Sequence, residues 1–207
     1  MPSAWIIVSA VLGYVLGSIS FAVMIARRRG VDILKEGSGN PGATNVKRVL
    51  GKTAGNIVFA LDCLKGVVAA GWPRALEALH ALPDSAPVTW MGIAGLAGAI
   101  IGHSCSMFLK FRGGKGVSTT VGGLFALMPL VMLAGIAVWL VVFYSTRYVS
   151  LASLLMGLAL TPVAWAFNQP PPYVGLCAVI AVLIVVRHRA NIKRLLDGTE
   201  ARFAKKK

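Results

Sequence analysis

The sequence predicts an all-α integral membrane protein with seven transmembrane helices, and three observations lead to this fold class. First, 57% of the 207 residues are hydrophobic and the mean hydropathy is +0.74. Second, residues 1–26 and 116–146 carry no charged side chain, and apolar runs of 18 or more residues are typical of membrane spans. Third, 21 Lys and Arg against 7 Asp and Glu give a net charge of +14, which gathers between the apolar runs as it does in cytoplasmic loops. This composition excludes a disordered chain, and the long uncharged runs exclude a soluble nucleic-acid-binding domain.

The first three apolar runs cover residues 4–26, 53–72 and 87–109. Three arginines, at positions 27–29, follow the first run. A signal peptide has its basic residues before its apolar segment, so we expect a retained helix whose C-terminal end faces the cytoplasm. The second run then crosses outward and the third returns, which places the 73–86 loop outside. In the third run Gly98 and Gly102 form a GxxxG pair, which permits close contact with another helix.

A run of 31 uncharged residues, 116–146, decides the rest of the topology. As one helix it would be about 46 Å long, against a hydrocarbon core of about 30 Å. A single crossing would also leave Arg147 and the basic C-terminal tail outside. We therefore predict a short-helix pair within 116–146, with Gly122-Gly123 or Pro129 as the turn. Two further spans are expected over 149–167 and 173–186.

This arrangement gives seven spans, with the N-terminus outside and the C-terminus cytoplasmic. Of the 21 basic residues only Arg74 then lies outside, in agreement with the positive-inside rule. We expect residues 1–207 to form a single membrane-embedded domain.

Two cytoplasmic segments, residues 37–52 and 102–116, combine glycines with basic and small polar side chains, and the first contains no acid. Glycines allow backbone N–H groups to surround an anion, and Lys or Arg supplies positive charge. A helix that opens after Gly116 would favour a phosphate at its N-terminus. The pattern predicts phosphate binding at the membrane surface. Contact with anionic lipid headgroups is the alternative, although it does not explain the density of Gly, Asn, Ser and Thr.

Several other polar residues lie in or near the apolar runs. Asp62 and Lys65 are three residues apart inside the second run, where a mutual ion pair is the favoured interpretation. His103 ends the third run, where a capping or packing role competes with catalysis. Cys105 lacks a base and an orienting group, so packing is favoured for it. His188 lies in a basic cluster at the start of the tail and is the best histidine for substrate contact.

At these segments the chain resembles the bacterial acyl-phosphate:glycerol-3-phosphate acyltransferases of the PlsY type. The resemblance rests on GSGNPGATNVKRVLGK at 37–52, GHSCSMFLKFRGGKGVSTT at 102–120, RYVSLAS at 147–153 and HRANIKRLLDGTE at 188–200. One departure is the stretch Ser104-Cys105-Ser106-Met107, where the family usually has an aromatic–proline step. The resemblance implies a seven-helix fold. It also implies transfer of a fatty acyl group from acyl phosphate to the sn-1 hydroxyl of glycerol 3-phosphate, giving lysophosphatidic acid and phosphate.

Mapped onto the matching positions, the resemblance implies a site without metal or other cofactor. Acyl phosphate is an activated mixed anhydride, so positioning and neutralisation of two phosphates supply most of the catalysis. The resemblance also implies that a phosphate oxygen of the substrate accepts the hydroxyl proton. Catalytic roles are expected for Lys115, Arg48, Ser38, His188 and Asn191. Substrate binding is expected for Gly37, Gly39, Asn40, Thr44, Asn45, Gly113, Gly114 and Ser150.

The expected partners are acyl phosphate, glycerol 3-phosphate and membrane lipid, with a functional link to the enzyme that makes acyl phosphate and no nucleic acid. We expect a multi-pass protein of the bacterial inner membrane with its site on the cytoplasmic face. A transporter of an organic phosphate is the alternative function. It would be expected to show internal repeats and broken helices at the midplane, whereas the polar motifs gather at one face. A lipid-binding scaffold is a third possibility, for which the loop glycines would be unnecessary.

Overall fold

The computed structural model describes residues 2–203, and within this range it contains α-helices, one 3-10 helix and a single isolated β-bridge. The all-α prediction is therefore confirmed. The chain divides into two compact units, residues 2–127 and 128–203, which are described separately below. The prediction of a single domain stays a prediction.

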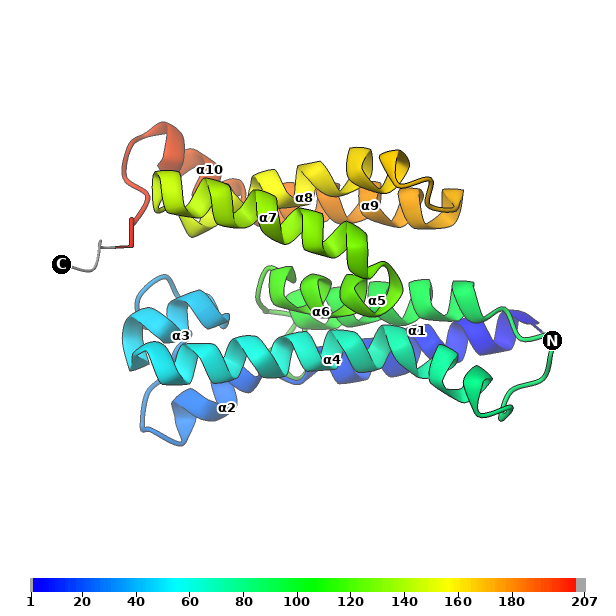
Figure 1. Cartoon of the computed structure of the whole chain (residues 1–207). Helices are drawn as coiled ribbons and strands as arrows, with labels where there is room; N and C mark the ends of the chain where they lie inside the picture. The colour runs from blue at the N-terminus through cyan, green and yellow to red at the C-terminus, as the bar shows by residue number, and fades with distance from the viewer. Residues whose placement is uncertain (1, 204–207) are drawn as a thin grey trace. The chain divides into compact units, whose positions relative to one another are not determined.

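The first unit contains six α-helices and the 3-10 helix. Helix α1 packs along α5, and α4 packs against both α5 and α6 (Figure 1). Their bounds are α1 Pro2–Ser18, α2 Phe21–Arg27, α3 Ala43–Leu50, α4 Lys52–Ala78, α5 Val88–Ser104, η1 Met107–Leu109 and α6 Val117–Leu127.

Glycines allow α1 and α5 to approach at backbone distance. A Cβ at Gly98 would collide with the carbonyl oxygen of Ala10, and one at Gly102 with that of Tyr14. From the other side, a Cβ at Gly17 would collide with the carbonyl oxygen of Ala99. The close helix contact predicted from the GxxxG pair is thus confirmed, and it is the kind of packing that small residues provide in membranes.

The first span is broken between α1 and α2, at Ile19 and Ser20. Ser20 caps α2 by accepting the N–H of Val23 at 3.4 Å. Beyond the break, α2, α3 and the start of α4 share one apolar cluster, and Leu109 of η1 packs against it. The buried members are Ala22, Val23, Ala26, Ile33, Val46, Ala54 and Val58. Both glycine-rich segments therefore border the same cluster at one end of the unit.

The second unit consists of four helices. Helix α8 contacts both α7 and α9, and α10 is bent from α9 by 60°. Their bounds are α7 Pro129–Thr146, α8 Val149–Ala166, α9 Pro171–Arg187 and α10 Arg189–Leu196.

The 116–146 run is divided as predicted, and the division falls at Pro129 rather than at the glycine pair. Helix α6 ends at Leu127 and α7 begins at Pro129, because a proline at the first helical position has no N–H to leave unpaired. Helix α6 has 11 residues, so it is only about 16 Å long at 1.5 Å per residue.

Within residues 2–203, four helical segments are long and apolar enough to cross a membrane, or five if the bent α9–α10 pair is one span. They are 3–27, 52–78, 129–146 and 149–166, while α5 and α6 are shorter apolar helices. The structure thus supports a multi-pass helical membrane protein. The count of seven spans and the orientation of the termini stay predictions.

We expect Gly98→Ala to destabilise the protein, because the new methyl group would separate α1 from α5. Overpacking of this kind costs about 1–3 kcal/mol, which should lower the midpoint of thermal unfolding in detergent. Gly175→Ala is the matched control, since nothing lies within 4 Å of its Cβ position, and it should leave the midpoint unchanged or raise it. An unchanged midpoint in Gly98→Ala would contradict the close packing.

Candidate functional site

The first glycine-rich segment is folded back onto α3 by the side chain of Asn45. Its Oδ1 accepts the backbone N–H of Ser38 at 2.9 Å, and its Nδ2 donates to the carbonyl oxygens of Glu36 at 2.9 Å and Ile33 at 3.3 Å. Asn45 is 2% exposed. Gly37 has a φ of +59°, and a Cβ there would collide with Asn45 Oδ1. The segment therefore needs both this amide and this glycine to present Ser38.

The predicted residues of α3 lie in its first and last turns. Thr44 is half-buried and Arg48 is exposed, and because they are four residues apart they lie on the same face of the helix. Gly42 is the N-cap residue. Asn40 precedes it and is half-buried. The structure thus joins Gly37, Ser38 and Asn45 by direct contact and places Arg48 one turn beyond.

The second glycine-rich segment is built on the end of α5. Ser106 accepts the N–H of Phe111 and donates its own N–H to Arg112, while its hydroxyl donates to the carbonyl oxygen of Ser18 at 2.6 Å. Lys110 and Phe111 both adopt left-handed backbone conformations, with φ of 53° and 58°. A turn stabilised by several hydrogen bonds of Ser106 therefore leads the chain into Gly113.

Gly113 and Gly114 then pack against His103, and Lys115 follows them. The N–H of Gly114 donates to the carbonyl oxygen of His103 at 2.9 Å, and a Cβ at Gly114 would collide with His103 Nε2. Gly114 is buried and Lys115 is half-buried. Gly116, with a φ of +80°, opens α6. The short stretch is thus packed on one imidazole and leads directly to a helix N-terminus, where an anion is favoured.

The predicted residues of the second unit include two that meet at an acid the sequence analysis did not single out. Ser150 Oγ and Asn191 Nδ2 each donate to Glu200 Oε1 at 2.7 Å, and Arg194 Nε donates to Glu200 Oε2 at 2.7 Å. Glu200 is 8% exposed. A signal for it was present, because Asp197 and Glu200 are the only acids in a strongly basic tail.

Burial alone would raise the pKa of the Glu200 carboxyl. The hydrogen bonds from Ser150, Asn191 and Arg194, together with the charge of Arg194, outweigh burial and hold this pKa below its ordinary value of 4.5. The carboxylate is therefore charged at neutral pH and ties α8, α10 and the tail together.

His188 lies at the junction of α9 and α10 and is 3% exposed. Its Nδ1 is 2.8 Å from the carbonyl oxygen of Ile184. Since a carbonyl oxygen only accepts, Nδ1 is the donor in this contact, and a neutral ring then has Nε2 as its acceptor. This geometry fixes the ring and suits the proposed contact of His188 with a hydroxyl group.

The structure therefore brings predicted residues together within each unit, and their roles toward a substrate stay predictions. In the first unit Arg48 and Lys115 supply positive charge beside glycines whose backbone approaches other groups closely. Within residues 2–203 no group of three or more His, Cys, Asp or Glu side chains is placed to hold a metal ion. The predicted site residues can neutralise charge, form hydrogen bonds and position a substrate.

Comparison with known proteins decides the family. The family model described as "Glycerol-3-phosphate acyltransferase" matches residues 7–198. The chain belongs to this family. Curated relatives named glycerol-3-phosphate acyltransferase include one from Geobacter sulfurreducens, 43% identical over 93% of this chain and 94% of its own length, and one from Aquifex aeolicus, 43% identical over 93% and 96%. This membership makes the protein an acyltransferase and disfavours the transporter.

Solved structures agree with this assignment. Two crystal structures of PlsY, an integral membrane glycerol 3-phosphate acyltransferase, are 41% identical to the chain. The glycerol 3-phosphate form has a TM-score of 0.86 and covers 96% of each chain. The lysophosphatidic acid form has a TM-score of 0.84 and covers 96% of this chain and 95% of the other. The acyltransferase thus shares the PlsY fold over almost its whole length.

We expect Glu200→Gln to destabilise this acyltransferase at neutral pH by about 1–3 kcal/mol, because it weakens three hydrogen bonds to a buried carboxylate. The folded-state pKa is lowered, so the stabilising contribution is present above pH 4.5 and is lost as the pH falls through the folded-state value. Thermal unfolding in detergent at pH 7 and pH 3.5 should show a smaller acid-induced loss in Glu200→Gln than in the unmodified protein. Asp197→Asn, an exposed change in the same tail, is the control. Equal acid sensitivity in all three proteins would contradict the role of Glu200.

Proposed function

We propose that this acyltransferase transfers a fatty acyl group from acyl phosphate to the sn-1 hydroxyl of glycerol 3-phosphate. The hydroxyl oxygen forms a bond to the acyl carbon, and the bond from that carbon to the phosphate oxygen breaks. Inorganic phosphate leaves with the electron pair, a phosphate oxygen takes the hydroxyl proton, and lysophosphatidic acid is the product. The solved PlsY structures, in glycerol 3-phosphate and lysophosphatidic acid forms, support this reaction.

The observation that carries the proposal is the pair of glycine-rich basic segments at one end of the first unit. Val46 in the first segment and Leu109 in the second pack on the same apolar cluster, so one core positions both. Arg48 and Lys115 would neutralise the phosphates of the two substrates. Fixed cationic donors of this kind stabilise charge that develops on the carbonyl oxygen and the leaving phosphate.

The remaining predicted residues take roles that follow from their surroundings. Ser38 is exposed, and its backbone is held by Asn45, so its hydroxyl is proposed as a substrate ligand. The side chain of Asn45 folds the segment, and we propose a positioning role for it. The backbone or side chains of the other members of the first unit would bind phosphate or glycerol oxygens: Gly37, Gly39, Asn40, Thr44, Gly113 and Gly114.

The predicted residues of the second unit are each held by neighbours within that unit. Glu200 fixes Ser150 and Asn191 at 2.7 Å each, and Ile184 fixes the ring of His188. Side chains held in this way lose little freedom when they bind a substrate, which favours positioning of a hydroxyl group. We propose that Ser150, His188 and Asn191 contact glycerol 3-phosphate.

The proposed cellular arrangement is a seven-span protein of the bacterial inner membrane, with its N-terminus outside and the site on the cytoplasmic face. The distribution of basic residues supports this orientation. Acyl phosphate would then come from a cytoplasmic enzyme that makes it, and the acyl chain would lie in the inner leaflet.

We expect Lys115→Ala and Arg48→Ala to lower kcat/KM by about a hundredfold or more, because each removes a fixed positive charge from a phosphate. The assay measures phosphate release that depends on both acyl phosphate and glycerol 3-phosphate. Lys35→Ala is the matched control, since that side chain is 84% exposed in the same cytoplasmic region, and it should keep nearly full activity. Near-native activity of both test variants in folded protein would overturn the site.

Orientation is tested by cysteine labelling with a membrane-impermeant maleimide in intact and permeabilised cells. We expect Asp84→Cys to be labelled in intact cells, and Arg112→Cys and Asp197→Cys only after permeabilisation. Asp84 and Arg112 lie on the two sides of α5, and Asp197 reports on the tail. Because the protein has three native cysteines, the unmodified protein is the background control. Labelling of Arg112→Cys in intact cells would contradict a cytoplasmic site.

A further inference from the structure

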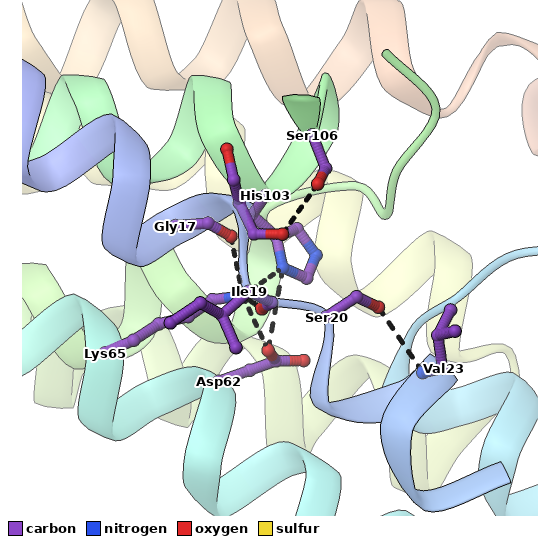
Figure 2. A network of polar contacts seen from close by, with 9 residues as sticks. Gly17, Ile19, Ser20, Val23, Asp62, Lys65, His103 and Ser106 are labelled. Carbon is purple, nitrogen blue, oxygen red and sulfur yellow. Dashed lines mark hydrogen bonds and ion pairs between the residues drawn. The ribbon is translucent and has the colours of Figure 1, made fainter. Parts of the chain in front are cut away.

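A cluster of ionisable side chains is buried between α4, α5 and the break after α1, and none of its members is among the residues proposed to bind substrate. Asp62 Oδ1 lies 2.8 Å from Lys65 Nζ, and their side chains are 2% and 1% exposed. His103 Nδ1 lies 2.9 Å from Lys65 Nζ and 3.6 Å from Asp62 Oδ1. The ion pair expected from the spacing of Asp62 and Lys65 is therefore present, and His103 joins it (Figure 2).

The ammonium group of Lys65 has four acceptors around it. Besides Asp62 and His103, the carbonyl oxygens of Gly17 and Ile19 lie at 3.0 and 2.9 Å. An ammonium has three N–H groups, and these are matched by the two carbonyl oxygens and by His103 Nδ1. The carboxylate of Asp62 supplies the opposite charge at 2.8 Å. Nδ1 of His103 then acts as acceptor, and a neutral ring carries its proton on Nε2. The cluster thus fixes the orientation of the ring as well as its position.

The opposite edge of the same imidazole meets the second glycine-rich segment. A Cβ at Gly114 would collide with Nε2. The carbonyl oxygen of His103 accepts the Gly114 N–H at 2.9 Å. A Cβ at Gly113 would also collide with that carbonyl oxygen. His103 therefore contacts the buried ion pair with one ring nitrogen and Gly114 with the other.

The cluster also holds the break that leads to the first glycine-rich segment. Lys65 Nζ donates hydrogen bonds to the carbonyl oxygens of Gly17 and Ile19, on both sides of Ser18. The hydroxyl of Ser106 donates to the carbonyl oxygen of Ser18 itself at 2.6 Å. These three carbonyl groups lie at a helix end, where they lack intrahelical partners. The ring of Phe21, at the start of α2, lies 5.7 Å from Lys65 Nζ. Figure 2 shows Gly17, Ile19 and Ser20 of this segment lying beside the cluster.

We propose that Asp62, Lys65 and His103 are positioning residues for phosphate binding: they fix Gly113–Lys115 relative to the α1–α2 break and so set the geometry of both glycine-rich segments. This inference rests on the proposed role of Lys115. None of the three side chains is required to touch substrate. The alternative is that the cluster stabilises the fold alone, in which case its loss would reduce the amount of folded protein and leave substrate affinity unchanged.

The test is the double variant Asp62→Asn/Lys65→Met, which removes both buried charges and preserves the approximate size of each side chain. We expect KM for at least one phosphate substrate to rise about tenfold or more, while kcat per folded molecule changes by less than about threefold. Asp32→Asn/Lys35→Met is the matched control, since it removes an exposed Asp–Lys pair of the same spacing, and it should leave both constants unchanged. A lower unfolding temperature with unchanged KM for both substrates would overturn the proposal.

Combination with Lys115→Ala separates this proposal from the proposed site. If the cluster acts through the segment, Asp62→Asn/Lys65→Met should weaken the Lys115→Ala protein much less than it weakens the unmodified one, because coupled residues are not additive. Full additivity overturns the positioning role and leaves the site intact. Near-native activity of Lys115→Ala overturns this inference, and near-native activity of Arg48→Ala as well overturns the proposed site.

If the double variant does not fold, a second pair of variants tests the positioning role of His103. Gly114→Ala should raise KM because its methyl group would collide with His103, and adding His103→Asn should restore part of the loss. Asparagine retains an acceptor near the position of Nδ1 and lacks the ring atoms that touch Gly114. Restoration supports the ring contact as the link. No restoration would show that His103 does not position the segment.

Discussion

A buried ammonium group organises the first unit. Lys65 has almost no contact with solvent, so all of its N–H groups must find acceptors within the protein. The carboxylate of Asp62 supplies the opposite charge, and the interrupted helix after Ser18 supplies two carbonyl oxygens. A continuous first helix would have used those carbonyl groups internally. The break in the first span and the burial of Lys65 therefore depend on each other, and α2, with the segment beyond it, takes its direction from this arrangement.

Glycine and helix ends account for much of the rest. Close packing of α1 on α5 brings the end of α5 beside the break, so that Ser106 and Lys65 reach consecutive carbonyl groups. The glycines of 113–116 then allow the chain to pass over His103 without a side chain between them. The second unit uses a different device, in which one carboxylate, Glu200, gathers donors from α8 and α10. In both units a buried charge orders groups that are distant in sequence.

Whether a feature could be predicted from the sequence depends on how far apart in the chain its contacting residues are. The division of residues 116–146 and the Asp62–Lys65 pair depend on neighbours within a few residues, and both were predicted, with Pro129 as one of two expected turns. The break after Ser18 was not, because residues 4–26 read as one apolar run and the stabilising Lys65 lies 46 positions from Ile19. The contact between Glu200 and Ser150, which are 50 residues apart, was hidden for the same reason. Asn45 was expected to bind substrate from the family resemblance, whereas the structure shows its amide groups folding the segment.

Ser106 lies in the stretch where the family usually has an aromatic–proline step. Its φ of −67° is the value that a proline ring imposes, yet its N–H and hydroxyl both donate hydrogen bonds. A proline restricts the backbone by covalent structure, and that restriction persists in the unfolded chain. Here the same conformation is maintained by bonds that water can replace. The order of this turn therefore exists only in the folded protein and depends on continued exclusion of solvent from the serine.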